Sequence, residues 1–539
     1  MKKVMAVTIA GPESSLTPAL DDLVGDHVAS RIAARDATIW GPAAEAEARR
    51  RLAWVDLAAS SRPLVATIEQ LRADFRARGL DRVVLCGMGG SSLGPEVVCA
   101  AAGVDLTVVD SSDPGQVAAA LAGDLAHTVV VVSSKSGGTL ETDSQHRAFR
   151  RAMREAGLDP RDHVVVVTDP GTVLDAEARA AGYVVINGNP DVGGRFSVLS
   201  AYGLVPSGLA GADISALLDE AAAVSGRLGS DDAANPGLQL GALLGVAAVN
   251  GVDKLVLDED LSGAPGFGDW AEQLIAESTG KDGRGLLPVV VPSPRRSDDP
   301  ATPLTPPGPD ALIVSGGPVP LRTTSGLAAA IQAPLGAAFL LWEYAVSIAG
   351  RVIGINPFDQ PDVESAKQAS RALLEDRGAS PEAAFRDGAI EVHATRGLLD
   401  GTQEARAAVA ALLAQVDPAH GYLAVMAYLD RVAHADLAAV RDSLATRLGR
   451  PVTFGWGPRF LHSTGQFHKG GAPVGVFLQI TATPVTDVEI PDRPFTFGQY
   501  IQAQAAGDAV VLGEHGRPVL RLHLTDLDAG LEQLRSILG

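Results

Sequence analysis

The sequence predicts an α/β protein with two doubly wound parallel-sheet domains, a helical N-terminal segment and a small α+β C-terminal region. The chain has 539 residues. Because single hydrophobic cores stop growing at about 250–300 residues, a chain of this length is expected to form more than one domain. Short Val-rich runs are each followed by a small-residue turn and a helical pattern, which is typical of a parallel sheet covered on both faces. Apolar residues make up 46% and charged residues 20%, the composition of a folded and not a disordered chain.

The elements follow in order along the chain. Residues 1–75 carry apolar side chains at three- and four-residue steps, which predicts helices. The first α/β domain is expected over 76–235, the second over 236–414, and the α+β region over 415–539. The expected strands of the two domains are Arg82–Cys86, Leu106–Val109, Thr128–Val132, His163–Val167, Tyr183–Ile186, Lys254–Leu257, Leu286–Val291, Ala311–Val314 and Ile353–Ile355.

The composition also limits the kinds of molecule that are expected to bind the protein. The formal charge of −20 repels polyanions, so nucleic acid is not expected to bind, whereas a small anion can still be held locally.

The two cysteines, Cys86 and Cys99, have no Cys or His cluster near them in the sequence. They are therefore expected to be buried and reduced, as in a cytoplasmic protein, with no zinc site. The N-terminus has no signal-peptide core, and the apolar stretch 322–343 is interpreted as a core helix, not a membrane span. The Pro-rich stretch 292–310 is expected to be a surface loop.

Two small-residue motifs follow expected strands. CGMGGSSLGPEV contains Gly89, Gly90 and Ser91, where glycines let the backbone approach a ligand and a helix start offers N–H groups. A tight turn without a ligand explains this motif about as well.

The second motif, SSKSGGTLET, places three hydroxyls and a lysine round two glycines, which favours a phosphate cradle over a simple helix cap. Its candidate phosphate ligands are Ser134, Lys135, Ser136 and Thr139.

Charged residues stand in four further motifs. Arg195 follows two glycines in VGGRFSVLS, and it either stabilises developing negative charge or lies on a surface loop. Glu277 in GDWAEQLIAESTGK falls on the apolar face of a helix, where burial raises a carboxyl pKa as a general base requires; the solvent margin of that face is the even alternative.

Two motifs nearer the C-terminus offer a lysine and two histidines. INPFDQPDVESAKQ contains Gln360 and Lys367, and Lys367 is either catalytic or a lysine whose stem lies on the apolar face while its charge reaches solvent. FLHSTGQFHKGG offers His462 and His468 without a zinc spacing, and a structural histidine is equally consistent with it.

Taken together, these motifs resemble glucose-6-phosphate isomerase of the type with two SIS (sugar isomerase) domains, over about residues 30–375. Their order is most similar to the isomerase portion that some bacteria carry fused to transaldolase. The resemblance implies a sugar contact for the glycine loop, phosphate binding by the loop at 134–139, enediolate stabilisation by Arg195, and proton transfer by Glu277. It also matches Gln360 and Lys367 to the glutamine and lysine of the last active-site helix.

One departure concerns the ring-opening histidine, which the family places between the glutamate and the lysine. Residues 278–366 contain no histidine. His468 is therefore expected to take that role, with His462 second. In the family a partner subunit usually lends this histidine, so the resemblance implies a homodimer.

The implied activity is reversible interconversion of glucose 6-phosphate and fructose 6-phosphate through a cis-enediol, with neither metal nor cofactor. Three alternatives stay open. A broader isomerase would also accept mannose 6-phosphate. A non-catalytic SIS sugar-phosphate sensor would need the phosphate loop but not Glu277, Lys367 and Arg195 together. A dehydrogenase would use Asp110 for a ribose, but it requires GxGxxG, and Ser92 stands where the third glycine would be.

Overall fold

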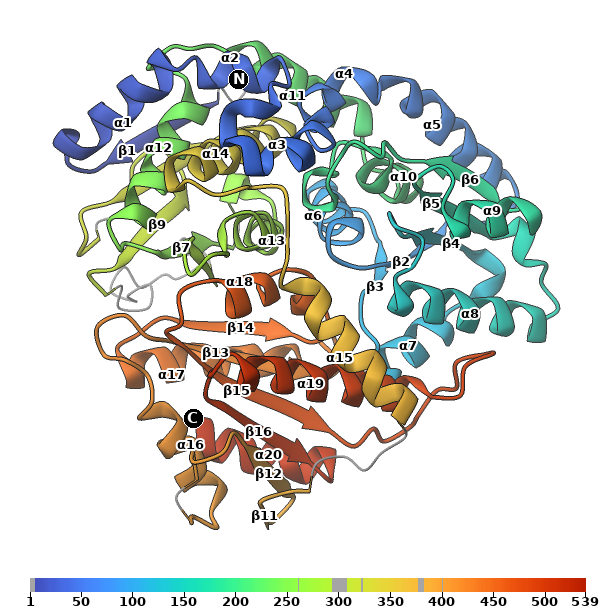
Figure 1. Ribbon diagram of the computed structural model, residues 1–539. Helices are drawn as coiled ribbons and strands as arrows, with labels where there is room; N and C mark the ends of the chain where they lie inside the picture. The colour runs from blue at the N-terminus through green and yellow to red at the C-terminus, as the bar shows by residue number, and fades with distance from the viewer. Residues whose placement is uncertain (1–4, 260, 293–307, 321–322, 377–381, 400) are drawn as a thin grey trace.

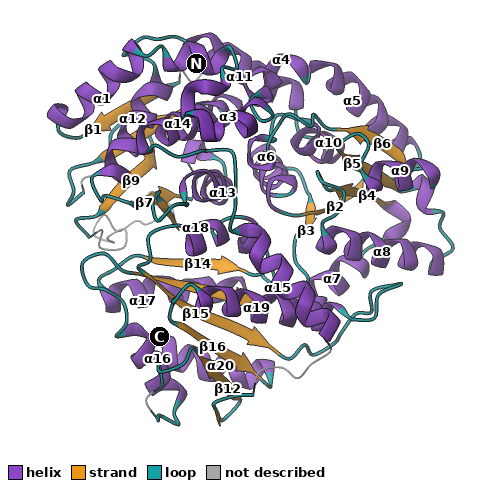
Figure 2. Cartoon of the chain, viewed as in Figure 1, coloured by secondary structure: helices purple, strands orange, loops and turns teal. Residues whose placement is uncertain are grey.

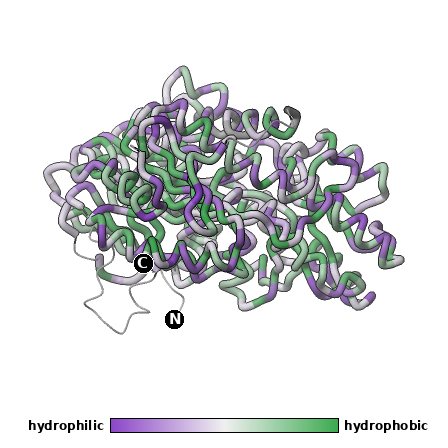
Figure 3. Tube along the Cα trace, turned by 90° about the horizontal axis from the view of Figure 1, so that it is seen from below, coloured by the Kyte–Doolittle hydropathy of each residue, from purple (hydrophilic) through white to green (hydrophobic). Residues whose placement is uncertain are grey.

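Three β-sheets organise the chain. The structure is a computed structural model that describes residues 5–539 except 260, 293–307, 321–322, 377–381 and 400. Two sheets have five strands and the third has six, and helices cover them (Figure 2). Over the described residues, hydrophilic and hydrophobic segments alternate along the trace (Figure 3). The expected α/β fold class is confirmed, while the exact limits of each unit stay a prediction.

The first unit contains a parallel five-stranded sheet of order β3-β2-β4-β5-β6. All five of its strands lie where the Val-rich runs predict them. Its strands are β2 (Arg82–Gly87), β3 (Thr107–Val109), β4 (Thr128–Ser133), β5 (Val164–Thr168) and β6 (Val184–Asn187). Its helices are α6 (Leu93–Ala102), α7 (Pro114–Leu121), α8 (Leu140–Glu155), α9 (Val173–Ala180), α10 (Ala201–Ala210) and α11 (Ile214–Leu228).

The second unit has the sheet order β1-β10-β9-β7-β8. Its strands are β7 (Lys254–Asp258), β8 (Leu287–Val291), β9 (Ala311–Gly316), β10 (Ala328–Gln332) and β1 (Ala6–Ala10). Its helices are α12 (Pro236–Val249), α13 (Phe267–Thr279), α14 (Leu335–Ile353) and α15 (Val363–Asp376). The helices before β2 are α1 (Glu13–Gly25), α2 (Val28–Ala33), α3 (Pro42–Arg49), α4 (Leu57–Ser60) and α5 (Arg62–Ala77).

Three details of this unit differ from the sequence prediction. The mostly helical N-terminal segment begins with a strand, because β1 pairs antiparallel with β10 at the sheet edge. The run Ile353–Ile355 is not a strand, since α14 ends at Ile353 and Gly354, with φ +79°, terminates the helix. The stretch 322–343 is not one helix, because its alanines form β10 between β1 and β9. The Pro-rich stretch falls mostly outside the described residues.

The third unit holds a mixed sheet of order β11-β12-β16-β15-β13-β14. Its strands are β11 (Phe385–Asp387), β12 (Ile390–Ala394), β13 (Tyr422–Tyr428), β14 (Val452–Trp456), β15 (Gly475–Ala482) and β16 (Val519–Leu524). Its helices are α16 (Ala405–Leu413), α17 (Val440–Leu448), α18 (Gly465–Gly470), α19 (Phe497–Glu514) and α20 (Leu527–Leu538). In Figure 1 this orange-to-red unit lies below the other two, and α15 runs along it beside α19.

Helix α14 is the central helix of the second unit. Among the described residues it alone has the length and apolar composition of a membrane span, but its apolar window is 89% buried in the protein. It also carries Glu343, which is 0% exposed and has no hydrogen-bond partner for either carboxylate oxygen. Burial raises the pKa of Glu343 well above its usual value.

We expect Glu343→Gln to stabilise the protein increasingly as the pH rises. The folded state holds Glu343 protonated, whereas the unfolded chain ionises it, so wild-type stability is lost from the unfolded pKa upward until the folded pKa is reached. Each pH unit in that window costs the wild type about 1.4 kcal/mol relative to the variant. Thermal unfolding of both proteins at pH 6 and pH 8 measures the difference. Glu532→Gln, at an exposed position of α20, is the control, and an equal gain at the two pH values would contradict the prediction.

Candidate active site

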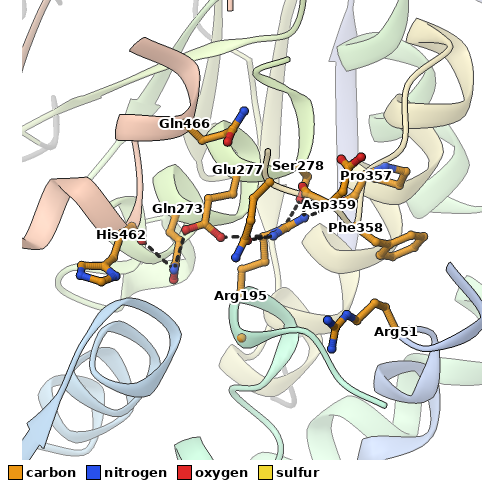
Figure 4. Close-up of polar contacts among 12 residues, drawn as sticks. Arg51, Arg195, Gln273, Glu277, Ser278, Pro357, Phe358, Asp359, His462 and Gln466 are labelled. Carbon is orange, nitrogen blue, oxygen red and sulfur yellow. Dashed lines mark hydrogen bonds and ion pairs between the residues drawn. The ribbon is translucent and has the colours of Figure 1, made fainter. Parts of the chain in front are cut away.

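A buried ion pair stands where the first two units meet. Glu277 lies in the last turn of α13, and Arg195 lies in the short 3-10 helix Gly194–Phe196. Arg195 Nη1 is 3.2 Å from Glu277 Oε2, and the side chains are 3% and 7% exposed (Figure 4). Both side chains are therefore buried: Glu277 lies on the apolar face that the helical spacing predicts, and Arg195 is not on a surface loop.

Arg195 is held in one geometry by neutral acceptors. It donates to Ser278 Oγ at 2.8 Å and to Gln360 Oε1 at 2.6 Å. It also donates to the carbonyl oxygens of Pro357 at 2.6 Å and Asp359 at 3.2 Å. Because a guanidinium is a planar fork of donors, these contacts fix its plane and tie the loop before Gln360 to the helix end that bears Glu277.

The surroundings tune the carboxyl group of Glu277. Burial raises the pKa of Glu277, while the Arg195 cation and the Gln273 amide oppose that rise. Gln273 Nε2 donates to Glu277 Oε1 at 3.3 Å from one turn earlier on α13. A buried carboxyl group whose pKa is raised by burial and lowered by a neighbouring cation has the balance that a general base needs, since it can accept a proton without a large energetic penalty.

Lys281 supports the same loop, and the sequence analysis did not single it out. Its Nζ donates to the carbonyl oxygens of Asn356 at 2.7 Å and Asp359 at 2.6 Å, and to Asp359 Oδ1 at 2.6 Å. Burial and the neighbouring Arg195 cation lower the pKa of Lys281 to about 8. Its position four residues after Glu277 in the same motif is the sequence signal that could have identified it.

The glycine loop packs directly against these groups. Gly89 has φ +55°, and a Cβ there would lie 2.8 Å from Gln273 Nε2 and 3.1 Å from the Cβ of His462. A Cβ on Gly90 would lie 2.0 Å from the carbonyl oxygen of Gly194, so only glycine fits. Ser91 is buried next to them at the end of the short helix Gly89–Ser91. The loop therefore lies within reach of anything bound at Glu277.

The predicted phosphate loop joins β4 to α8. Ser134 is buried and donates to Thr139 Oγ1 at 3.2 Å, while Ser136 Oγ accepts the N–H of Gly138 at 3.3 Å. Lys135 pairs with Asp169, which also accepts from Tyr202 Oη at 2.6 Å. Burial lowers the pKa of Lys135. The hydroxyls and the cation lie on one tight loop, as a phosphate cradle requires.

Arg51 adds a cation that the sequence analysis missed. It lies near Arg195 in Figure 4, and its charge is among the causes that lower the pKa of both Arg195 and Lys135. Its own partners are Glu47 Oε1 at 2.7 Å and the carbonyl oxygen of Pro190 at 3.4 Å. Nothing in its local sequence marks it, because it comes from the N-terminal helical segment and reaches the site only through tertiary packing.

The two candidate histidines lie in different surroundings. His462 is beside Gln273 and Glu277 in Figure 4; its Nε2 is 3.0 Å from Glu141 Oε1, and its carbonyl oxygen accepts from Gln273 Nε2 at 2.8 Å. Glu141 lies in the first turn of α8, directly after the phosphate loop.

His468 lies instead in an aromatic cluster with Tyr422, Phe460 and Phe477. It is 3% exposed, its Nδ1 is 3.1 Å from Tyr422 Oη, and burial lowers its pKa to about 3. Among the contacts of the described residues, none joins His468 to Glu277 or Arg195. The geometry therefore favours His462, the second candidate, over His468.

The remaining candidates lie on the segment that enters α15. Gln360 precedes the helix and contacts Arg195, as described above. Lys367 lies on α15, but its side chain is outside the described residues. Asp110, the acid that a ribose would need, is 0% exposed and paired with Arg431 and Arg459, so it is occupied by the protein itself.

Comparisons with known proteins identify the family of the chain. A family model described as Phosphoglucose isomerase matches residues 67–281. A probable glucose-6-phosphate isomerase of Natronomonas pharaonis is 32% identical over 343 residues, which cover 54% of this chain and 79% of the relative. The chain belongs to the glucose-6-phosphate isomerase family.

Two further comparisons set the extent of the similarity. A probable glucose-6-phosphate isomerase of Haloquadratum walsbyi is 35% identical over 212 residues, 38% of this chain, and the match spans about half of that relative, 49%. A crystal structure of a glucose-6-phosphate isomerase from Chlamydia trachomatis matches with a TM-score of 0.52 and 22% identity, covering 66% of this chain and 79% of the other. That structural likeness supports the fold.

Proposed function

We propose that the protein interconverts glucose 6-phosphate and fructose 6-phosphate. The observation that carries the proposal is the buried Glu277–Arg195 pair at 3.2 Å, connected through Gln273 and His462 to the helix that follows the phosphate loop. A base, a fixed cation and a phosphate cradle are the groups that moving a proton between neighbouring carbons of a sugar phosphate needs.

In this mechanism the phosphate loop supplies binding energy that positions the carbon chain. His462 and Lys367 assist ring opening by moving protons at the ring oxygen and O1. Glu277 removes the proton from C2 and returns it to C1 through a cis-enediol, and the reverse reaction retraces these steps. Arg195 stabilises the negative charge that develops on the enediolate oxygens, and it does so without rearranging because its neighbours already hold it.

Glu141 explains how His462 can act. With one ring nitrogen engaged by the Glu141 carboxylate at 3.0 Å, the tautomer and the ring plane are fixed, and the other nitrogen remains for the sugar. This contact also links the histidine to the phosphate loop, because Glu141 lies in the first turn of the helix that follows this loop.

The test is a coupled assay with the purified chain, in which glucose 6-phosphate formed from fructose 6-phosphate is oxidised by a dehydrogenase. We expect turnover in both directions. Turnover of mannose 6-phosphate at a comparable kcat/KM would support the broader isomerase. Binding of the sugar phosphates without turnover would support the sensor and overturn the enzymatic proposal.

The phosphate loop gives a separate prediction. We expect Lys135→Met to raise KM for fructose 6-phosphate by about 10-fold or more and to lower kcat less, because a charge-assisted contact to a remote phosphate acts mainly in binding. Steady-state kinetics at several ionic strengths measure the effect. Arg161→Met, which removes an exposed cation of the same unit, is the control. An unchanged KM for Lys135→Met would remove this lysine from the phosphate site.

Assembly and compartment complete the proposal. We propose a cytoplasmic enzyme, supported by two buried free thiols, Cys86 and Cys99. The homodimer implied by the family resemblance stays a proposal about assembly, tested by sedimentation velocity.

A further inference from the structure

We propose that the third unit, Phe385–Gly539, completes the active site of its own chain and so takes the place that a partner subunit occupies when a histidine is lent between subunits. This inference rests on the proposed function. It is supported by three sets of contacts that link the unit to the catalytic groups of the same chain.

The first set positions the histidine. His462 ends the short helix Arg459–His462 of the third unit, yet both of its polar contacts are with other units. Its ring is 3.0 Å from Glu141 of the first unit, and its carbonyl oxygen accepts from Gln273 of the second. Glu141 Oε1 also accepts from Gln504 Nε2 of α19 at 2.8 Å. The third unit therefore supplies the imidazole and helps to orient the carboxylate that fixes it.

The second set of contacts fixes the position of the segment that carries Gln360 and Lys367. Gln466 of α18 accepts the N–H of Asp362 at 3.0 Å, and its Nε2 donates to Asp362 Oδ2 at 2.7 Å. The same Nε2 donates to the carbonyl oxygen of Gly280 at 2.9 Å, three residues after Glu277. One side chain thus joins the start of α15 to the end of α13, and Gln466 lies over Glu277 in Figure 4.

Close packing continues along α15. This helix lies against α19, and a Cβ on Gly507 would come within 2.8 Å of the backbone nitrogen of Ser370, so a glycine is needed for the two helices to approach. The helix that bears Lys367 therefore packs against the third unit.

The third set is a cluster of ion pairs round Asp110, which is 0% exposed. Arg431 and Arg459 come from the third unit, and Glu96 and Asp110 from the first. Arg431 lies 2.8 Å from Glu96 Oε1 and 3.1 Å from Asp110 Oδ1, while Arg459 lies 2.7 Å from Glu96 Oε2 and also pairs with Asp110. Because Asp110 is fully buried, removing its arginine partners would leave a buried charge unpaired, so these pairs tie the third unit to the first. Because Arg459 and His462 share one short helix, docking also fixes the histidine.

Each chain then contains all the groups of the active site, and the histidine comes from the same chain as Glu277. Glu277, Arg195, Glu141 and His462 are joined by contacts within one chain. A dimer, where it forms, leaves these contacts unchanged.

The test is complementation between two inactive variants, Glu277→Gln and His462→Ala. Each is expected to reduce kcat by about 100-fold or more. The two are co-expressed with different affinity tags, and species carrying both tags are purified. If the histidine acts within its own chain, every chain in a hybrid lacks one group, and activity does not exceed that of the separate variants. If it acts across subunits, one of two sites in a hybrid dimer is intact, and about half of the wild-type activity returns.

The outcomes separate this inference from the proposed function. Recovered activity in the hybrid would overturn the inference and leave the isomerase proposal standing, whereas an inactive wild type would overturn both. Where no hybrid forms, sedimentation velocity under assay conditions decides: an active monomer supports the inference, and activity confined to a dimer that dissociates into inactive monomers overturns it. His462→Asn, which keeps a polar group of similar size, repeats the experiment if the alanine variant fails to fold.

Discussion

We expect Glu277→Gln to reduce isomerase turnover by about 10³- to 10⁴-fold and to leave sugar-phosphate binding within a few-fold of wild type. The amide keeps the size of the side chain and can still accept from Gln273 and lie beside Arg195, so the site retains its shape. It cannot accept the C2 proton, and the step that defines the reaction is lost. Binding survives because the phosphate loop lies on a different element, between β4 and α8.

The measurement combines the coupled assay with calorimetric binding of fructose 6-phosphate. A more specific readout is exchange of the C2 proton of glucose 6-phosphate with deuterated solvent, which should disappear together with turnover. Glu272→Gln is the matched control, since Glu272 lies on the same helix, is not in contact with Arg195, and has a pKa that burial raises to about 8. Because the pKa of Glu272 is raised and its carboxyl group lies away from Arg195, the isosteric amide should change turnover little. Turnover of Glu277→Gln near the wild-type rate would remove Glu277 from the mechanism.

The sequence was most informative where chemistry depends on local order. The loop at 134–139 could be singled out as the candidate phosphate site because its hydroxyls, lysine and glycines lie within six residues at the end of a Val-rich strand, and the carboxyl ends of such strands are where ligands bind. Glu277 could be predicted because the helical period alone places it on the apolar face of α13. In both cases a short segment carries the whole signal.

The sequence was least informative where the site depends on contacts between distant segments. Arg51 enters from the N-terminal helices, and His462 comes from a unit whose position is set by pairs such as Arg459 with Asp110. The same limit explains β1, whose partner β10 lies more than 300 residues away and leaves no local trace. His468 was the preferred histidine on its motif alone, yet burial among aromatic rings is a property of packing.

Arg195→Lys tests whether the geometry of the cation, beyond its charge, contributes to catalysis. A lysine keeps the positive charge but has one nitrogen in place of a planar fork, so it cannot serve Ser278, Gln360 and the carbonyl oxygens of Pro357 and Asp359 together. We expect kcat to fall by about 10²- to 10³-fold, with a smaller change in KM, because the lost contact is strongest with the charge of the enediolate. Stability should fall by about 1–3 kcal/mol, since buried acceptors lose their donor.

The control for that loss of stability is Arg450→Lys. Arg450 is also buried, and it forms two hydrogen bonds with Asp310, at 2.9 and 2.6 Å, and one with the carbonyl oxygen of Gly421 at 2.9 Å, away from the catalytic groups. Both variants should unfold more easily, but only Arg195→Lys should lose turnover when both are assayed well below their unfolding temperatures. Equal kcat values for the two variants would mean that Arg195 serves the fold alone, and the charge of the enediolate would then have to be stabilised by Lys281 or Arg51, the two other cations beside it.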